Sequence, residues 1–148
     1  MRIEKTLPAA SKRLVVIRED APLTDAAKLL LEGDTDLLVV CDADKRMAGV
    51  ISKTDVVRQI SNRQGERPAS ASTVMTRAVV SCRPNDLLHH VWSLVKERKL
   101  KDIPILDQDS RPIGVLNARD LLEALLEEVE HEETLLRDYV MNVGHPRL

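Results

Sequence analysis

The chain has 148 residues, and its 22 Lys and Arg side chains against 24 Asp and Glu side chains leave a formal net charge of −2. This near balance lacks the excess of cations that would attract a polyphosphate backbone, so nucleic acid is not an expected partner. One Trp, one Tyr and no Phe exclude binding that depends mainly on stacking against aromatic rings.

The apolar runs of the sequence are short. The longest is Leu37–Cys41, with five residues, whereas a membrane helix requires about 20. Residues 1–5 carry charges with no apolar signal segment behind them. We therefore expect a cytoplasmic protein with no membrane partner. Cys41 and Cys82 lie at apolar stretches and are expected to be reduced, partly buried strand residues and not a disulfide pair.

The first half of the chain predicts the order strand, helix, strand, strand, helix. Leu37–Cys41 is a continuous apolar run, which suits a strand covered on both faces, and the polar residues 42–45 predict a turn into the next strand. The expected elements are a strand at 14–17, a helix at 24–31, strands at 37–41 and 47–51, and a helix at 52–60.

The second half repeats this pattern after a polar stretch with Gly and Pro at residues 61–70. Gly49–Val57 aligns with Gly114–Leu122 at an offset of 65 residues, and Asp20–Pro22 aligns with Cys82–Pro84 at an offset of 62. We assign the difference to a longer first helix in the second half, where apolar residues recur at helical spacing. Each half is too small to bury a large core and to be stable by itself, so the two halves are expected to share one interface.

The last helix is expected to continue well beyond its counterpart in the first half. Apolar residues fall near a seven-residue repeat that Glu132 interrupts, at Leu122, Leu125, Val129, Leu136, Tyr139 or Val140, and Val143. The stretch is acidic, which is typical of a solvated helix face or of an arm that contacts a partner. We prefer the arm, because a free helix would leave its apolar stripe exposed. The basic segment before residue 19 is expected to contact this acidic helix in a salt-sensitive way.

The repeated loop Gly-x-x-Ser/Asn-x-x-Asp lies between a predicted strand and a predicted helix in both halves. Ser52 and Asp55 form a capping-box pattern, and Asn117 before Asp120 is the same device with an amide cap. A helix start can also hold a phosphate on its free N–H groups, and a nearby carboxylate can accept the two hydroxyls of a ribose. Capping and ligand binding are compatible at one helix start, and the duplication favours a binding role in addition to the cap.

The duplicated elements, the polar turns, the triplet Ile103-Pro104-Ile105 before Asp107 and the two Gly–Asp loops resemble a tandem pair of CBS (cystathionine beta-synthase) domains, a Bateman module. The resemblance implies an α/β (α+β) fold of two β-α-β-β-α repeats packed with pseudo-two-fold symmetry, plus an extended C-terminal helix. We assign residues 1–61 and 72–126 to the repeats, 62–71 to the linker and 127–148 to the helical extension.

The resemblance also implies binding of an adenosine-containing ligand in clefts between the repeats. By position, the ribose and phosphate roles fall on Ser52, Thr54 and Asp55 in the first loop and on Asn117 and Asp120 in the second, and the adenine-side role falls on Ile103, Pro104 and Ile105. Asn117 stands where Ser or Thr is usual, and Val39 lies where a proline would match Pro104. The two clefts are therefore not expected to be equivalent.

The leading hypothesis is a stand-alone sensor that passes its bound state to an unidentified regulated protein. Its ligand is AMP, ADP, ATP or another adenosyl compound such as NAD or S-adenosylmethionine, with no required cofactor. The alternative is a ligand-independent dimerisation or protein-interaction module, and the resemblance implies a homodimer in either case. An enzyme is the least expected class, because the Ser, His and Cys residues lack catalytic or metal-ligand spacing.

Overall fold

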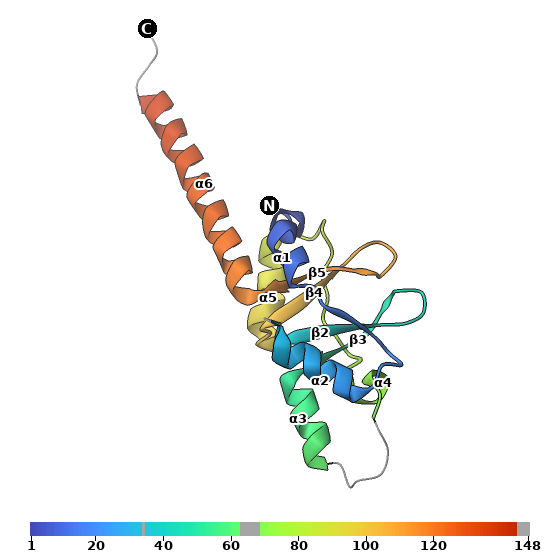
Figure 1. Cartoon of the computed structure of the whole chain (residues 1–148). Coiled ribbons are helices and arrows are strands. Elements are labelled where there is room, and N and C mark those ends of the chain that lie inside the picture. The colour runs from blue at the N-terminus through green and yellow to red at the C-terminus, as the bar shows by residue number, and fades with distance from the viewer. Residues whose placement is uncertain (34, 63–68, 145–148) are drawn as a thin grey trace.

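The computed structural model describes residues 1–33, 35–62 and 69–144, with the side chains of the last helix as far as Met141. Figure 1 shows a body of small sheets and helices from which one long helix projects. The elements are the 3-10 helix η1 (Ile3–Thr6), α1 (Leu7–Arg13), β1 (Val16–Arg18), α2 (Leu23–Glu32), β2 (Leu37–Cys41), β3 (Met47–Ser52), α3 (Lys53–Asn62), α4 (Ala71–Val74), α5 (Leu88–Arg98), β4 (Asp102–Leu106), β5 (Pro112–Asn117) and α6 (Ala118–Gly144).

The mixed fold with two repeats is confirmed. In the first repeat β1 runs parallel to β2, and β2 pairs antiparallel with β3. In the second repeat β4 and β5 form the equivalent antiparallel pair. Both hairpins have the same register, because Leu37 pairs with Ser52 and Asp102 pairs with Asn117. The turns of the two hairpins lie side by side (Figure 1) and are joined by a hydrogen bond of 2.9 Å from the Met47 N–H to the Ser110 carbonyl.

A single offset of 65 residues relates the repeats from the first strand onward, so the offset of 62 at Pro22 and Pro84 is wrong. The parallel pair Ile17–Val40 corresponds to the bridge Cys82–Ile105, and α2 and α5 also begin 65 residues apart, at Leu23 and Leu88. The first helix of the second repeat, α5, is only one residue longer than α2, and with a constant offset there is no three-residue difference for it to accommodate. The alignment of Pro22 with Pro84 rested on the proline that precedes the first helix in each repeat.

The expected first strand of the second repeat is reduced to the bridge at Cys82. In the first repeat the N–H groups of Glu19 and Val39 donate to Cys41 and Val15 on either side of the pair, each at 3.0 Å. The residues at these two donor positions in the second repeat are Pro84 and Pro104. Because proline has no N–H to donate, the ladder cannot extend beyond the bridge.

Each repeat is covered by the N-terminal segment of the other, which the sequence did not predict. Helix α1 packs on β5, and a Cβ built at Gly114 would lie 3.1 Å from the Ala10 Cβ. The segment after α4 packs on β3, where a Cβ at Gly49 would lie 2.6 Å from the Thr76 carbonyl oxygen. At Gly49 the Thr76 backbone approaches too closely for any side chain, and at Gly114 a side chain would fit only if the Ala10 segment moved by a few tenths of an ångström.

Three groups of buried side chains hold this arrangement together. The core of the second repeat includes Ile3 and Ala10 from the N-terminus, and that of the first repeat includes Ala71 and Met75 from beyond the linker. The third group joins the two sheets and contains Val39, Cys41, Val50 and Val115. The expected shared interface is therefore confirmed. The predicted linker at 62–71 falls largely on residues 63–68, which lie outside the described residues.

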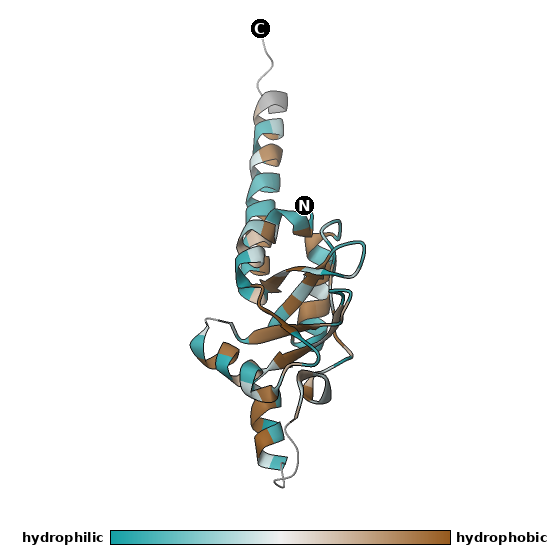
Figure 2. Cartoon of the chain, turned by 45° about the vertical axis from the view of Figure 1, so that its right-hand side comes forward, coloured by the Kyte–Doolittle hydropathy of each residue, from teal (hydrophilic) through white to brown (hydrophobic). Residues whose placement is uncertain are grey.

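The expected contact between the basic N-terminus and the acidic last helix is also confirmed, at the base of α6. The amino group of Met1 lies 2.8 Å from Glu128, the Lys5 Nζ lies 3.1 Å from Glu127, and the Arg13 Nη1 lies 2.5 Å from the Asp120 Oδ2. Beyond these pairs the helix leaves the body, with hydrophobic and hydrophilic residues alternating along it (Figure 2). Among the described residues no helix has the length and apolarity that a bilayer crossing requires.

Both cysteines are free and buried, as expected. Burial raises the pKa of the Cys41 thiol to about 11 and that of the Cys82 thiol to about 12, and the nearby carboxylates of Asp42 and Asp86 add to the effect. Since only the thiolate reacts, we expect iodoacetamide at pH 8 to label the native chain at least about a hundredfold more slowly than the unfolded chain. Mass spectrometry of timed samples measures both rates. Rapid labelling of the folded chain would contradict this environment.

Candidate functional site

The two repeated loops form the helix caps that their sequences predict. At the start of α3 the Ser52 N–H donates to the Asp55 Oδ2 at 2.9 Å, and the Asp55 N–H donates to the Ser52 Oγ at 3.3 Å. At the start of α6 the Asp120 N–H donates to the Asn117 Oδ1 at 2.8 Å. The first loop is thus a reciprocal capping box. The other carboxylate oxygen of Asp55, Oδ1, lies 3.5 Å from the Arg58 Nη1.

A cavity of about 500 Å³ lies between the repeats and is called the first cleft below. Its volume is within the range of small-molecule sites. The first repeat contributes Leu37, Val50, Ser52 and Asp55, and the second contributes Thr76, Ala78, Val79, Val80, Arg98, Leu100, Asp102 and Pro104. The cleft thus combines aliphatic walls with one capping carboxylate and the exposed backbone before Cys82.

Pro104 changes the hydrogen bonding of this backbone. In the first repeat the Val39 N–H donates to the Val15 carbonyl. Pro104 and Val80 are the equivalents of these two residues, and proline cannot donate. Within the described chain no hydrogen bond to the Val80 carbonyl is found. Because Val80 lines the first cleft, its carbonyl is a candidate main-chain acceptor for a ligand there.

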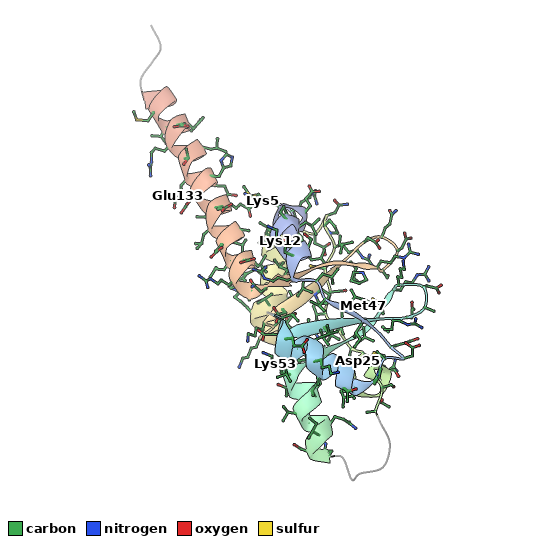
Figure 3. The ribbon with its side chains drawn as sticks, viewed as in Figure 1. Lys5, Lys12, Asp25, Met47, Lys53 and Glu133 are labelled. Carbon is green, nitrogen blue, oxygen red and sulfur yellow. The ribbon has the colours of Figure 1, made fainter. Side chains whose placement is uncertain are left out.

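Another cavity, of about 320 Å³, is called the adjoining cavity below. It shares Leu37, Ser52 and Asp102 with the first cleft. Its other lining residues are Asp36, Lys53, Thr54 and Lys101. The Lys53 Nζ lies 3.3 Å from an Asp36 carboxylate oxygen, and the Lys101 Nζ lies 3.7 Å from the other. Figure 3 shows Lys53 at the start of α3. This adjoining cavity thus places two cations beside the N-terminal turn of a helix.

Asp102 lies where these cavities meet. Burial raises the pKa of its carboxyl group, and the carboxylate of Asp36 raises it further, while Lys101 and Arg13 act in the opposite direction. The sequence did not identify Asp102 as a site residue, because its only signal is its place before the Ile103–Ile105 triplet. The cleft residues Thr76, Ala78, Val80, Arg98 and Leu100 carry no motif and depend on the packing of the repeats.

The pseudo-equivalent cavity beside the second loop, the second cleft, has a volume of only about 70 Å³. Its lining residues are Arg13, Thr35, Asp36, Leu37, Asp102, Val115 and Asn117. Val115, Asn117 and Thr35 correspond to Val50, Ser52 and Leu100 of the first cleft. The two clefts differ strongly in size, in line with the expectation that they are not equivalent.

The structure brings some of the predicted site residues together and separates others. Ser52, Asp55 and Pro104 line the first cleft, and Thr54 lines the adjoining cavity. Ile103 and Ile105 do not line it with their side chains, because successive side chains of a strand point to opposite faces and both are buried in the core of the second repeat. Asn117 lines the second cleft. Asp120 lines a cavity of about 410 Å³ between α1 and α6, and Arg13 lines both of these cavities.

Comparison with known proteins supports the same organisation. A family model described as CBS domain matches residues 6–62 and 71–127. An uncharacterised 17.7 kDa protein of Acidianus ambivalens is 26% identical over 123 residues, which cover 83% of this chain and 74% of that protein. A homoserine O-acetyltransferase of Methanohalobium evestigatum is 23% identical over 78% of this chain, which spans only 22% of that enzyme.

Solved structures have the same fold. The CBS domain pair of protein MJ0100, in complex with 5′-methylthioadenosine and S-adenosyl-L-methionine, superposes with a TM-score of 0.72 at 17% identity, covering 86% of this chain and 98% of that one. CBSX2 in complex with AMP superposes with a TM-score of 0.66 at 26% identity, covering 78% of this chain and 90% of that one.

Proposed function

Because the chain belongs to the CBS domain family, as a tandem pair of these domains, we propose that it is a regulatory module that binds an adenosine-containing nucleotide in the first cleft and relays the bound state to a partner protein. The observation that carries the proposal is the composition of this cleft. The cleft has a volume of about 500 Å³, with Ser52 and Asp55 contributed by one repeat and Val80 and Pro104 by the other. A ligand that contacts both repeats can change how they pack.

Each part of such a ligand has a matching group in the two adjoining cavities. The aliphatic side chains of Leu37, Val50 and Val79 suit the flat faces of a base, and the free Val80 carbonyl accepts a hydrogen bond from the adenine amino group. The Asp55 Oδ1 accepts from a ribose hydroxyl while Oδ2 stays in the cap. Ribose at the shared border places the phosphate in the adjoining cavity, at the start of α3 and near Lys53.

The relatives support this assignment without identifying the ligand. CBSX2 was solved in complex with AMP and is 26% identical to this chain. We take AMP as the first probe for that reason, with ADP, ATP, NAD and S-adenosylmethionine as the other candidates. We propose a binding role and not a catalytic one, because the CBS domain model matches both repeats and the Ser52 and Asp55 side chains of the first cleft are engaged in a helix cap.

Thermal unfolding of the unmodified chain tests the proposal directly. A ligand at about 100 times its Kd stabilises the native state by about 2.7 kcal/mol, which raises the Tm by roughly 5–11 °C for a chain of this size. The matched probe is IMP, because it has a carbonyl in place of the amino group that faces Val80. We expect AMP to raise the Tm more than IMP at equal concentration. No shift with any of the five adenosine compounds would contradict the proposed function.

The exposed face of α6 supports a second element, the homodimer. Here the seam means the positions Leu122, Leu126, Val129, Glu133, Leu136 and Val140, which alternate at spacings of four and three residues along the helix. The apolar seam residues are between 41% and 64% exposed. Leu125, which the sequence placed on this face, packs instead against the core of the second repeat, so the polar break in the seam is Glu133 and not Glu132. Val143 lies outside the described side chains.

We propose that a second copy of the chain covers this seam as a coiled coil. Figure 3 shows Glu133 on the part of α6 that projects beyond the body, where no other element of the chain covers it. Arg137 is the single basic residue between Glu127 and Tyr139 if His131 is neutral. At coiled-coil positions it meets Glu132 of a second copy in a parallel pair and Glu130 in an antiparallel one. These Arg–Glu pairs offset part of the repulsion between two acidic helices and can form in either orientation of a second copy.

A further inference from the structure

We propose that each chain binds a single nucleotide, because the Arg13 side chain fills the second cleft and takes its carboxylate. This inference rests on the proposed function, since it concerns which of the two related clefts admits the ligand. Its support comes from the 65-residue offset, which allows the clefts to be compared position by position.

Position 13 is the point at which the clefts differ most in bulk. Arg13 lines the second cleft, and its equivalent in the first cleft is Ala78. The second cleft measures about 70 Å³ and the first about 500 Å³. Valine stands in both clefts at positions 50 and 115, and Thr35 is smaller than its equivalent Leu100, so these positions do not close the second cleft. A guanidinium side chain in place of a methyl group is the change in the lining that reduces its space.

Arg13 also occupies the polar group that a ribose would need. Its Nη1 is buried and lies 2.5 Å from the Asp120 Oδ2, although the Arg13 side chain as a whole is 35% exposed. A neutral diol that displaced this cation would exchange a charged partner for an uncharged one and leave the buried Nη1 without its carboxylate. In the first cleft the corresponding carboxylate, Asp55, has its nearest cation, Arg58, on the exposed side of α3.

The main-chain acceptor on the second side is also less available. The Val15 carbonyl, which corresponds to the Val80 carbonyl, accepts the N–H of Val39 at 3.0 Å. A carbonyl oxygen can accept two hydrogen bonds, so Val39 weakens a contact with an adenine amino group without preventing it. Arg13 is therefore the group that excludes the nucleotide, and its removal opens a site that binds more weakly than the first cleft.

Isothermal titration calorimetry with AMP tests the inference. The unmodified chain is expected to bind one AMP per chain. Arg13→Ala, which copies the residue of the first cleft, is expected to add a second and weaker binding event while leaving the first unchanged. Ala78→Arg is expected to abolish the first event. Because Arg13→Ala also removes an ion pair to α6, Lys5→Ala serves as the matched control, since it removes the Lys5–Glu127 pair outside the cleft and should leave one site.

The outcomes separate the two proposals. No binding by the unmodified chain would contradict the proposed function. Two events in the unmodified chain, or one event in a folded Arg13→Ala chain titrated to about 100 times the first Kd, would overturn the single-site inference alone. The combined variant Arg13→Ala with Ala78→Arg provides a second check, because it should bind only in the second cleft and its binding should then depend on Asp120.

Discussion

Replacing Asp55 by alanine is expected to weaken AMP binding about ten- to a hundredfold. A hydrogen bond to a charged acceptor contributes about 1.5–3 kcal/mol, and Asp55 is the carboxylate of the first cleft that lies at a helix start. Its side chain is only 12% exposed, so water compensates little for the lost acceptor. Calorimetry of the unmodified and variant chains measures the change in Kd.

The cap makes a second variant necessary. Asp55→Ala also removes the acceptor of the Ser52 N–H, which costs about 0.5–2 kcal/mol of stability. Asp55→Asn keeps an oxygen for that N–H but offers the ribose a weaker, uncharged acceptor, so it should lose affinity with less effect on the Tm. Asp120→Asn is the matched control at the equivalent helix start. Equal losses in Asp55→Asn and Asp120→Asn would contradict the assignment of the ligand to the first cleft.

Local patterns predicted the fold well because they act over short distances. The apolar run Leu37–Cys41 is a buried strand, and the capping pattern of Ser52 and Asp55 forms as expected. The packing of α1 on β5 could not be predicted in this way, because Ala10 contacts Gly114 across more than a hundred residues of chain. The close approach becomes apparent only when the repeats are placed around their pseudo-two-fold axis.

The site was predictable only in part for the same reason. Strand alternation alone could have separated Pro104 from Ile103 and Ile105, since neighbours in a strand face opposite sides. The role of Arg13 had no local signal, because it lies in a helix of the first repeat that covers the second. Asp120, which the loop motif placed beside Asp55 as an equal candidate, is distinguished from it by this one tertiary contact.

Replacing Leu136 by alanine is expected to raise the Kd of self-association by roughly 25- to 600-fold. A leucine that becomes fully buried from full exposure contributes about 1.5–3 kcal/mol, and a symmetric dimer loses two leucines that are partly exposed beforehand. Leu136 lies in the seam and is 64% exposed in the single chain. Alanine retains helix propensity, so α6 itself should persist. Sedimentation equilibrium over a range of chain concentrations measures the effect.

The adjacent Leu135 provides the control that separates pairing from general hydrophobicity. It is 55% exposed, close to Leu136, but it lies outside the seam, so Leu135→Ala should leave the Kd nearly unchanged. Equal effects of the two variants would point to nonspecific association, and a monomeric unmodified chain would contradict the dimer. Removal of residues 127–148 should abolish pairing through α6. If AMP binding survives that removal with one site per chain, ligand recognition belongs to the paired repeats and assembly to the helix.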